Sequence, residues 1–314
     1  MSERQEAAAW LRGKAAKKIL SELYGEAAFR TQAERYARLA DLTDDDAPAS
    51  ELRFYSAPGR TELGGNHTDH NKGRVLCAAV RLDAVACATP VKGLRVSLRS
   101  EGYADPIVVD LSDLEPRAKE RGKTEALVRG VAKALSLRGV EPRGFVGRIH
   151  SEVLRGSGLS SSAAVEVLLG AIMADMAGVE ISAIELAKAG QFAENEYFGK
   201  PCGLMDQTAS AVGGVVAIDF ADPTAPKVKR VDFDFEDEGY CLAVVDTGGS
   251  HADLTSDYAA IPTEMKAVAA VLGAGALREI DPELLISRGP EIRRSCGDRA
   301  LLRALHFVAE NARV

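Results

Sequence analysis

One segment of the chain strongly constrains the fold, because it has no polar face. Residues 165–176 are apolar at nearly every position and Gly178 follows as an expected C-cap, which predicts a buried helix. The chain has 314 residues, 46% hydrophobic and 27% charged, so it can supply a core around such a helix. At about 150 residues per domain, this length fits two domains.

The remaining pattern predicts an α+β fold, because strands and helices alternate irregularly rather than in regular βα units. Helix-forming residues dominate from Glu6 to Leu42, with an interruption at Gly25. Further helices are predicted at 127–137 and 181–197. Strands are predicted at 52–56, 74–80, 84–88, 95–98, 107–111, 144–149, 212–218 and 240–245.

Charge and cysteine content exclude several classes of protein. The 39 Lys and Arg residues against 46 Asp and Glu give a net charge of −7, which shows no basic footprint for nucleic acid or an anionic membrane. The chain has neither a signal peptide nor a run of about 18 apolar residues. Five cysteines without CxxC spacing indicate free thiols. We expect a cytoplasmic protein without a membrane or nucleic-acid partner, and no feature indicates an oligomeric state.

A loop rich in glycine and serine, Gly156–Ala164, leads directly into the apolar helix. Glycines let the backbone approach an anion, while serine hydroxyls and the free N–H groups of the first helical turn supply donors. The loop therefore predicts a phosphate-binding site, although it lacks the Gly-Lys-Ser/Thr ending of a Walker A loop. A serine-capped helix after a flexible turn is an equally good interpretation of these residues alone.

Two further segments are unusually polar for their surroundings. Ala57–Gly73 lies between predicted strands and carries Asp, Asn and His side chains that can bind a polyhydroxyl ligand, although a surface loop explains it more simply. Its His67 and His70 have metal-ligand spacing, but no other ligand motif accompanies them. In Phe192–Gln207, a solvated charge is the simpler interpretation of Glu194, whereas Asp206 fits either a solvated charge or a desolvated base.

Taken together and in order, these segments resemble the GHMP kinase superfamily and, within it, the galactokinases. The matching motifs are Pro-Gly-Arg followed by His-Thr-Asp, then Gly-Leu-Ser-Ser-Ser-Ala, then Cys-Gly-Leu-Met-Asp-Gln, and finally Val245–Tyr258. The resemblance runs from about Phe54 to the C-terminus, and accidental agreement is a poor explanation for four motifs in the correct order.

The resemblance implies a two-domain fold with mixed sheets backed by helices. It divides the chain into an N-terminal helical segment over 1–50, a kinase domain with the sugar and ATP loops over 51–220, and a partial C-terminal domain over 221–314. The chain ends shortly after a helical face formed by Leu301, Ala304, Leu305 and Val308, and it lacks the family's third glycine-rich motif. We therefore expect an incomplete second domain.

The resemblance also implies an activity, the ATP-dependent phosphorylation of galactose at its anomeric hydroxyl. Arg60 and Asp206 would form the catalytic pair. The implied ATP phosphate-binding residues are Gly156, Ser157, Gly158, Leu159, Ser160, Ser161, Ser162 and Ala163. The implied sugar-binding residues are Asn66, His67, Asp69, Gly203 and Tyr258. Ser162 and Glu194 match the positions that hold Mg²⁺.

Three residues of the sugar loop depart from the family pattern. Glu62 stands where the family has Asn, Asn66 where it has Glu, and His70 where it has Tyr. An amide in place of a carboxylate changes the hydrogen-bond polarity offered to a sugar hydroxyl. Two alternatives therefore remain: a kinase of a related sugar such as N-acetylgalactosamine, or a catalytically impaired fragment or regulator that binds sugar and nucleotide.

Overall fold

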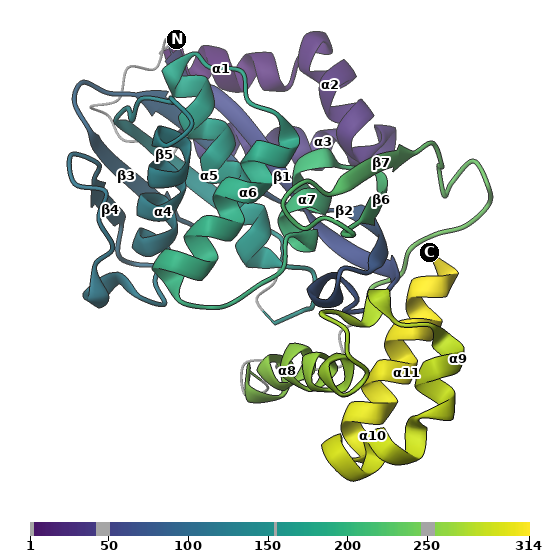
Figure 1. Ribbon diagram of the computed structural model, residues 1–314. Helices are drawn as coiled ribbons and strands as arrows, with labels where there is room; N and C mark the ends of the chain where they lie inside the picture. Colours follow the sequence, from purple (N-terminus) through teal and green to yellow (C-terminus); the bar gives the residue numbers. More distant parts are fainter. Residues whose placement is uncertain (1–2, 42–50, 154–155, 246–254) are drawn as a thin grey trace. The chain divides into compact units, whose positions relative to one another are not determined.

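The computed structural model describes residues 3–41, 51–153, 156–245 and 255–314 (Figure 1). The chain forms two compact units that interleave along the sequence. The first unit comprises Met1–Gly59, Val80–Leu154 and Ser160–Cys202. The second comprises Arg60–Ala79, Arg155–Leu159 and Gly203–Val314. Two strands and the glycine- and serine-rich loop therefore belong in part to each unit.

The two shared strands are β1 (Arg53–Gly64) and β2 (Arg74–Pro90). The other elements of the first unit are α1 (Glu3–Leu11), α2 (Lys14–Tyr24), the 3₁₀ helix η1 (Glu26–Ala28), α3 (Phe29–Asp41), β3 (Arg95–Ser100), β4 (Ile107–Asp110), the 3₁₀ helix η4 (Ala118–Glu120), α4 (Thr124–Ser136), β5 (Phe145–Ser151), α5 (Ser161–Ala177), α6 (Ala183–Phe192) and the π-helix η5 (Ala193–Phe198). Those of the second unit are the 3₁₀ helix η3 (Asp69–Asn71), α7 (Met205–Val212), β6 (Val215–Asp219), β7 (Lys227–Val231), α8 (Thr255–Val271), the 3₁₀ helix η7 (Leu277–Glu279), α9 (Pro282–Ser287), α10 (Gly289–Cys296) and α11 (Asp298–Arg313).

The first unit is built on a mixed sheet with the strand order β4-β3-β5-β2, in which β3 and β5 are parallel and the other neighbours antiparallel. The register of β2 on β5 pairs Ala84 with Ser151 and Pro90 with Phe145. Residues 84–89 of β2 are all buried, so helices must cover both faces of the strand. Figure 1 shows α4, α5 and α6, which contact one another, on one side of these strands.

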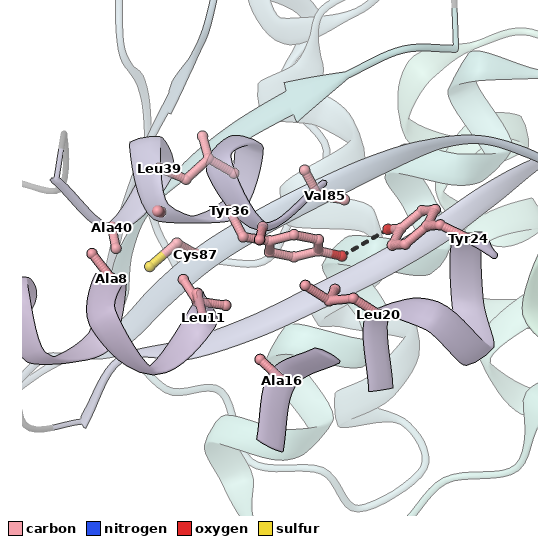
Figure 2. Packing of buried hydrophobic residues seen from close by; sticks show 12 residues of the cluster. Ala8, Leu11, Ala16, Leu20, Tyr24, Tyr36, Leu39, Ala40, Val85 and Cys87 are labelled. Atoms are coloured by element: carbon pink, nitrogen blue, oxygen red, sulfur yellow. Dashed lines mark hydrogen bonds between the residues drawn. The ribbon is translucent and has the colours of Figure 1, made fainter. Parts of the chain in front are cut away.

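Helices α1–α3 supply the cover for the other face. Their apolar residues, among them Leu11 and Leu20, form one cluster with Val85 and Cys87 of β2, as Figure 2 shows. Within that cluster the hydroxyls of Tyr24 and Tyr36 lie 2.9 Å apart. The polar tips of these tyrosines are thus hydrogen-bonded although their rings are buried, which removes the penalty of burying an unpaired hydroxyl.

The apolar helix predicted at 165–176 is confirmed as α5, which begins at Ser161 because the serines form its first turn. Leu168, Leu169 and Ile172 are fully buried, as a helix without a polar face requires. Gly178, with φ +70°, ends the helix in the left-handed conformation that glycine adopts at no steric cost.

The second unit combines a small antiparallel sheet with a helical core. The first half of β2 pairs with β6, and β6 pairs with β7. Apolar residues of α8–α11 and η7 pack together in a separate cluster, whose largest members are Met265, Leu277, Leu285, Ile292 and Phe307.

Three of the four residues of the predicted apolar face of α11 pack in this cluster, where Ala304 is buried and Leu301 and Val308 are partly buried. Helix α11 buries Ala300, Ala304 and Phe307, whereas Leu305 is 36% exposed. The small alanines Ala300 and Ala304 let the neighbouring helices approach closely, and Leu305 lies at the edge of the contact face.

Four other predicted elements differ from the structure. The strands predicted at 74–80 and 84–88 are one continuous strand, β2. The helix predicted at 181–197 changes from α to π geometry after Phe192. Residues 240–245, predicted as a strand, are exposed and have no regular secondary structure, because β-branched composition alone does not supply a hydrogen-bonded neighbour.

Candidate active site

The polar loop between β1 and β2 is folded tightly around Thr68, which is fully buried. The Thr68 hydroxyl lies 2.9 Å from the carbonyl oxygen of Gly65 and 2.5 Å from that of Arg74. Gly65 has φ +81°, and a Cβ there would lie 2.1 Å from the carbonyl oxygen of Arg74, so only glycine fits. The threonine of the His-Thr-Asp motif is therefore structural, and it fixes the positions of the residues on either side.

Two side chains of helix α11, which belongs to the same unit, form hydrogen bonds with the backbone of this loop. Glu310 is buried, and its Oε2 accepts hydrogen bonds from the backbone N–H groups of Gly65 (3.1 Å) and Asn66 (3.4 Å). The ring Nε2 of His306 lies 3.0 Å from the carbonyl oxygen of Asn66. Nothing in the local sequence pattern indicated Glu310 as a residue of the site, because its partners lie far away in the chain.

Arg60 and Asp206, the predicted catalytic pair, are in direct contact in the second unit. The Nε and Nη2 atoms of Arg60 donate to Oδ1 of Asp206 at 2.9 and 2.7 Å, and Nη1 donates to the carbonyl oxygen of Gly158 at 2.6 Å. Burial of Arg60 opposes its charge, but the Asp206 carboxylate outweighs this and raises the pKa of the guanidinium. Asp206 stands in the first turn of α7, where the helix dipole favours a negative charge.

Asp69 offers an acceptor without a protein donor. Its side chain is 5% exposed, and Oδ1 has no hydrogen-bond partner among the described residues. The nearest cationic candidate, Nε2 of His70, lies 3.8 Å away, which is beyond hydrogen-bond distance. A Cβ at Gly203 would lie 1.9 Å from Oδ2 of Asp69, so the glycine is required there. A buried carboxylate oxygen left unpaired is costly, and this geometry fits a ligand hydroxyl as the missing donor.

Glu62 joins these residues from β1. It follows Arg60 by two positions, so both side chains extend from the same face of the strand. Oε1 of Glu62 accepts a hydrogen bond from the backbone N–H of His67 at 3.3 Å. Burial, and then the Asp69 carboxylate, raise the pKa of Glu62 to about 7. Burial also lowers the pKa of His67, which favours the neutral imidazole.

The glycine- and serine-rich loop has the backbone of an anion-binding site. Gly156, Gly158 and Ser160 are left-handed, with φ of 75°, 77° and 57°, so left-handed residues occur at every second position. Alternation of this kind turns successive N–H groups toward one side. Ser160 precedes α5, but its side chain does not cap the helix. The Ser160 side chain therefore does not cap α5, contrary to the simple alternative, and the N–H groups of the first helical turn are the donors that would face an anion.

Glu194, for which the residues alone favoured a solvated charge, is buried in the first unit. It lies in the π-helix η5, a geometry that recurs at functional sites. Its Oε1 accepts from the hydroxyl of Ser162 at 3.0 Å and from Nζ of Lys200 at 3.1 Å. A carboxylate oxygen beside a hydroxyl oxygen is the donor set that Mg²⁺ takes together with phosphate oxygens, so these residues fit that ion.

The structure thus brings together Arg60 with Asp206, Asp69 with Gly203, and Ser162 with Glu194. Asn66 is exposed, and its backbone rather than its side chain makes the contacts described above. Tyr258 falls within α8, but its side chain is outside the part of the chain that the structure describes. Residues 246–254 of the fourth motif also lie outside the described residues.

Comparisons with known proteins agree with these motifs. A family model described as the GHMP kinases N terminal domain matches residues 126–214. A second model, the galactokinase galactose-binding signature, matches residues 45–90. The fold and the motifs thus define a GHMP kinase.

Individual relatives narrow the family further. The galactokinase of Streptomyces coelicolor (strain ATCC BAA-471 / A3(2) / M145) is 34% identical over 296 residues, which cover 92% of this chain and 72% of the relative. That of Glaesserella parasuis serovar 5 (strain SH0165) is 31% identical, covering 82% of this chain and 66% of the relative. The chain belongs to the galactokinase family.

Solved structures support the same assignment. The crystal structure of Lactococcus lactis galactokinase complexed with galactose superimposes with a TM-score of 0.69 at 25% identity, covering 95% of this chain and 71% of that one. Methanococcus jannaschii mevalonate kinase, at 17% identity and a TM-score of 0.53, shares the fold over 84% of this chain and 81% of its own. The predicted α+β fold with helix-backed mixed sheets is confirmed.

Among the described residues, no helix is both long and apolar enough to cross a membrane.

Proposed function

We propose that this protein transfers the γ-phosphoryl group of ATP to the anomeric hydroxyl of galactose and so forms galactose 1-phosphate and ADP. The observation that carries the proposal is the contact of Arg60 with Asp206 in the unit that also holds the unpartnered oxygen of Asp69. Because the chain belongs to the galactokinase family, we assign this contact a role in phosphoryl transfer.

Asp206 accepts the proton of the sugar hydroxyl as its oxygen forms the new bond to phosphorus. The bond between the γ-phosphorus and the bridging oxygen breaks, and ADP leaves with the electron pair. Arg60 holds the Asp206 carboxylate in place through two hydrogen bonds to one oxygen. Its guanidinium also stabilises the negative charge that spreads over the phosphoryl oxygens.

Asp69 binds the sugar by accepting a hydroxyl donor at Oδ1, which has no hydrogen-bond partner in the part of the chain that the structure describes. Gly203 leaves room for that carboxylate, and the buried Thr68 fixes the loop that carries it. The proposal therefore assigns Asp69 to binding rather than to chemistry. Two other residues of the same loop, His67 and the exposed Asn66, are further candidates for contacts with the sugar.

The loop Gly156–Ala163 would bind the ATP phosphates through its backbone N–H groups, since alternate residues are left-handed. Ser162 and Glu194 would hold Mg²⁺. When bound, this ion neutralises charge on the phosphate oxygens. Lys200 now pairs with the Glu194 oxygen and is positioned to exchange that contact for a phosphate. A cytoplasmic location stays a prediction, made from the five cysteines, none of which forms a disulfide in the structure.

The decisive experiment measures ADP release from ATP and Mg²⁺ with galactose, glucose and N-acetylgalactosamine in turn. Galactose-dependent turnover is expected, with Asp206→Asn lowering kcat by roughly 10²–10⁴-fold because proton transfer is lost. The Kd for ATP, measured by calorimetry, should stay within about threefold, since Asp206 acts in the transition state. A folded sample that binds galactose and ATP but forms no product would contradict the proposal.

A further inference from the structure

Helices α1 and α2 and the start of β1 enclose an apolar groove of about 790 Å³ in the first unit. Its floor is buried and includes Leu11 and Leu20, which Figure 2 labels. Its rim is apolar too, although Trp10, Ile19 and Leu23 are each about half exposed. Exposed apolar side chains that gather around a groove of this size mark a binding surface. We refer to it as the α1–α2 groove.

The α1–α2 groove runs along the edge of β1. Five consecutive residues, 52–56, line it. Successive side chains of a strand point to opposite faces, so a groove that all five residues line follows the edge of the strand. Within the described part of the chain β1 pairs with β2 alone, which leaves backbone N–H and C=O groups on this edge for another strand. The groove therefore suits an extended peptide with apolar side chains.

The neighbouring face of α2 is basic. This helix carries Lys14, Lys17 and Lys18 against one carboxylate, Glu22. Lys17 lies 3.8 Å from Glu26, whereas Lys14 and Lys18 form no ion pair with any residue that the structure describes. A peptide that enters the groove beside these two lysines is favoured when it is acidic.

The chain itself contains a segment with these properties, residues 232–245 of the second unit, which we call the acidic arm. Its first part, 232–238, has five carboxylates, and the whole arm has no Lys or Arg. Its second part, 240–245, was predicted as a strand but has no regular secondary structure. There the alternate residues Tyr240, Leu242 and Val244 are all exposed. In an extended strand these three side chains share one face and can enter a groove together.

We propose that two copies of this chain form a dimer by mutual exchange of the acidic arm. Residues 240–245 of one copy add as a strand to the edge of β1 in the other, and their apolar side chains fill the α1–α2 groove. The carboxylates of 232–238 then lie near Lys14 and Lys18. Each copy carries one groove and one arm, so exchange between two copies fills both grooves and closes the assembly. A planar membrane surface matches a concave groove less well. The inference does not depend on the proposed kinase reaction.

Sedimentation equilibrium of the full chain tests the dimer between about 1 and 200 μM, the range expected for a contact of modest size. Leu23→Glu places a carboxylate in the groove, and Leu242→Glu places one in the apolar part of the arm. Each should raise the Kd of the dimer at least tenfold. The matched controls Leu137→Glu and Leu302→Glu, at exposed leucines outside the groove and the arm, should stay within about threefold of the wild type. Added salt should also weaken the dimer.

Cross-linking identifies the contact itself. Unlabelled and ¹⁵N-labelled protein are mixed in equal amounts and treated with a short amine–thiol cross-linker. Cys241 is an exposed thiol of the arm, and Lys14 and Lys18 are exposed amines beside the groove. Mass spectrometry should find Cys241 joined to these lysines in peptide pairs that combine the two isotopes. Circular dichroism of every variant establishes that it is folded.

Four results would overturn the inference. The protein could remain monomeric up to about 200 μM. It could form a dimer that neither Leu23→Glu nor Leu242→Glu weakens, which would place the interface elsewhere. Cross-links confined to peptide pairs of one isotope would show that the arm reaches the groove of its own chain. A monomer that sediments with phosphatidylserine vesicles, and no longer does so as Leu23→Glu, would assign the groove to a membrane surface instead.

Discussion

At the scale of the residue, the site depends on close contacts that allow almost no change. Gly203 is the clearest case, because a Cβ there would overlap Oδ2 of Asp69 at 1.9 Å. Asp69 lies in a tight loop whose backbone is held by the hydrogen bonds of the neighbouring Thr68. Its carboxylate therefore has little room to move away.

We expect Gly203→Ala to raise KM for galactose at least tenfold, because Asp69 is displaced from its position. The Kd for ATP should change by less than about twofold. Steady-state kinetics with galactose varied, together with nucleotide calorimetry, check this prediction. Gly289→Ala is the matched control, since a Cβ at Gly289 would lie 3.9 Å from Cδ2 of Leu301, an ordinary van der Waals contact. Unchanged galactose kinetics in Gly203→Ala would mean that Asp69 does not bind the sugar.

Glu62 also makes a prediction about stability and pH. Its pKa is raised from an ordinary 4.5 to about 7 by burial and by Asp69, so the folded state binds a proton that the unfolded chain has already lost. The contribution of Glu62 is therefore most favourable below pH 4.5, declines between pH 4.5 and 7, and stays low above pH 7.

Glu62→Gln should accordingly be more stable than the wild type above pH 7, by up to about 3 kcal/mol, and nearly equal to it at pH 4.5. Urea unfolding at several pH values measures the difference. The opposite trend, in which the variant loses stability at high pH, would show that Glu62 is ionised and well compensated in the folded protein.

At the scale of the element, α11 is joined by hydrogen bonds to the sugar loop between β1 and β2. The single carboxylate of Glu310 binds two adjacent backbone N–H groups at the start of that loop. Charge-assisted hydrogen bonds of this kind contribute about 1.5–3 kcal/mol when buried.

Removing the Glu310 carboxylate by Glu310→Ala should raise KM for galactose several-fold and lower the free energy of unfolding by about 2 kcal/mol, because two backbone donors lose their acceptor. Glu310→Gln, which keeps one acceptor oxygen, should lie between this variant and the wild type. Chemical denaturation and galactose kinetics provide the two measurements. Loss of stability at unchanged KM would separate α11 from sugar binding.

The elements also show where sequence-based prediction succeeds. Helix α5 was predictable because its apolar composition permits only a buried helix, and the left-handed Gly178 ends it. The contact face of α11 was predictable at Leu301, Ala304 and Val308 but not at Leu305, which is 36% exposed because the packed face is centred on Ala300 and Ala304 instead. The continuous course of β2 depends on pairing with β5 and β6, which a local pattern cannot contain.

The site was predictable to the extent that its motifs are local. The sequence identified Arg60 and Asp206 separately, but their contact joins positions 146 residues apart, and only the family resemblance connected them. Glu62 departs from the family pattern, but the sequence assigns it no role in the site. The predicted strand ends at residue 56, whereas β1 continues to Gly64, so the spacing of two that places Glu62 beside Arg60 on one strand face was not recognisable from the sequence.

At the scale of the whole molecule, each unit has a hydrophobic core of its own. The cluster of α1–α3 with β2 serves the first unit, and the cluster of α8–α11 serves the second. The division into 1–50, 51–220 and 221–314 stays a prediction, since the two compact units follow contacts rather than continuous stretches of chain. Arg60, Glu62, Asp69 and Asp206 all belong to the second unit.

Galactose should therefore stabilise the second unit in particular. At about 100 times its Kd, the sugar should slow amide hydrogen exchange through global opening of this unit by roughly 100-fold, equivalent to about 2.7 kcal/mol. The effect should be greatest at residues 65–74 and in α11, which are joined by hydrogen bonds. Asp69→Asn, measured by the same mass spectrometry, should lose most of it. Protection confined to the first unit would contradict the assignment of the sugar residues.

The bond between Glu310 and Gly65 has a consequence for the order of events during synthesis. The two residues are 245 positions apart, and ribosomes add about 5–20 residues per second, so the loop emerges roughly 12–50 s before its acceptor exists. The loop between β1 and β2 therefore reaches its final form only after α11 has been synthesised, so this part of the protein folds well after its own residues have been made.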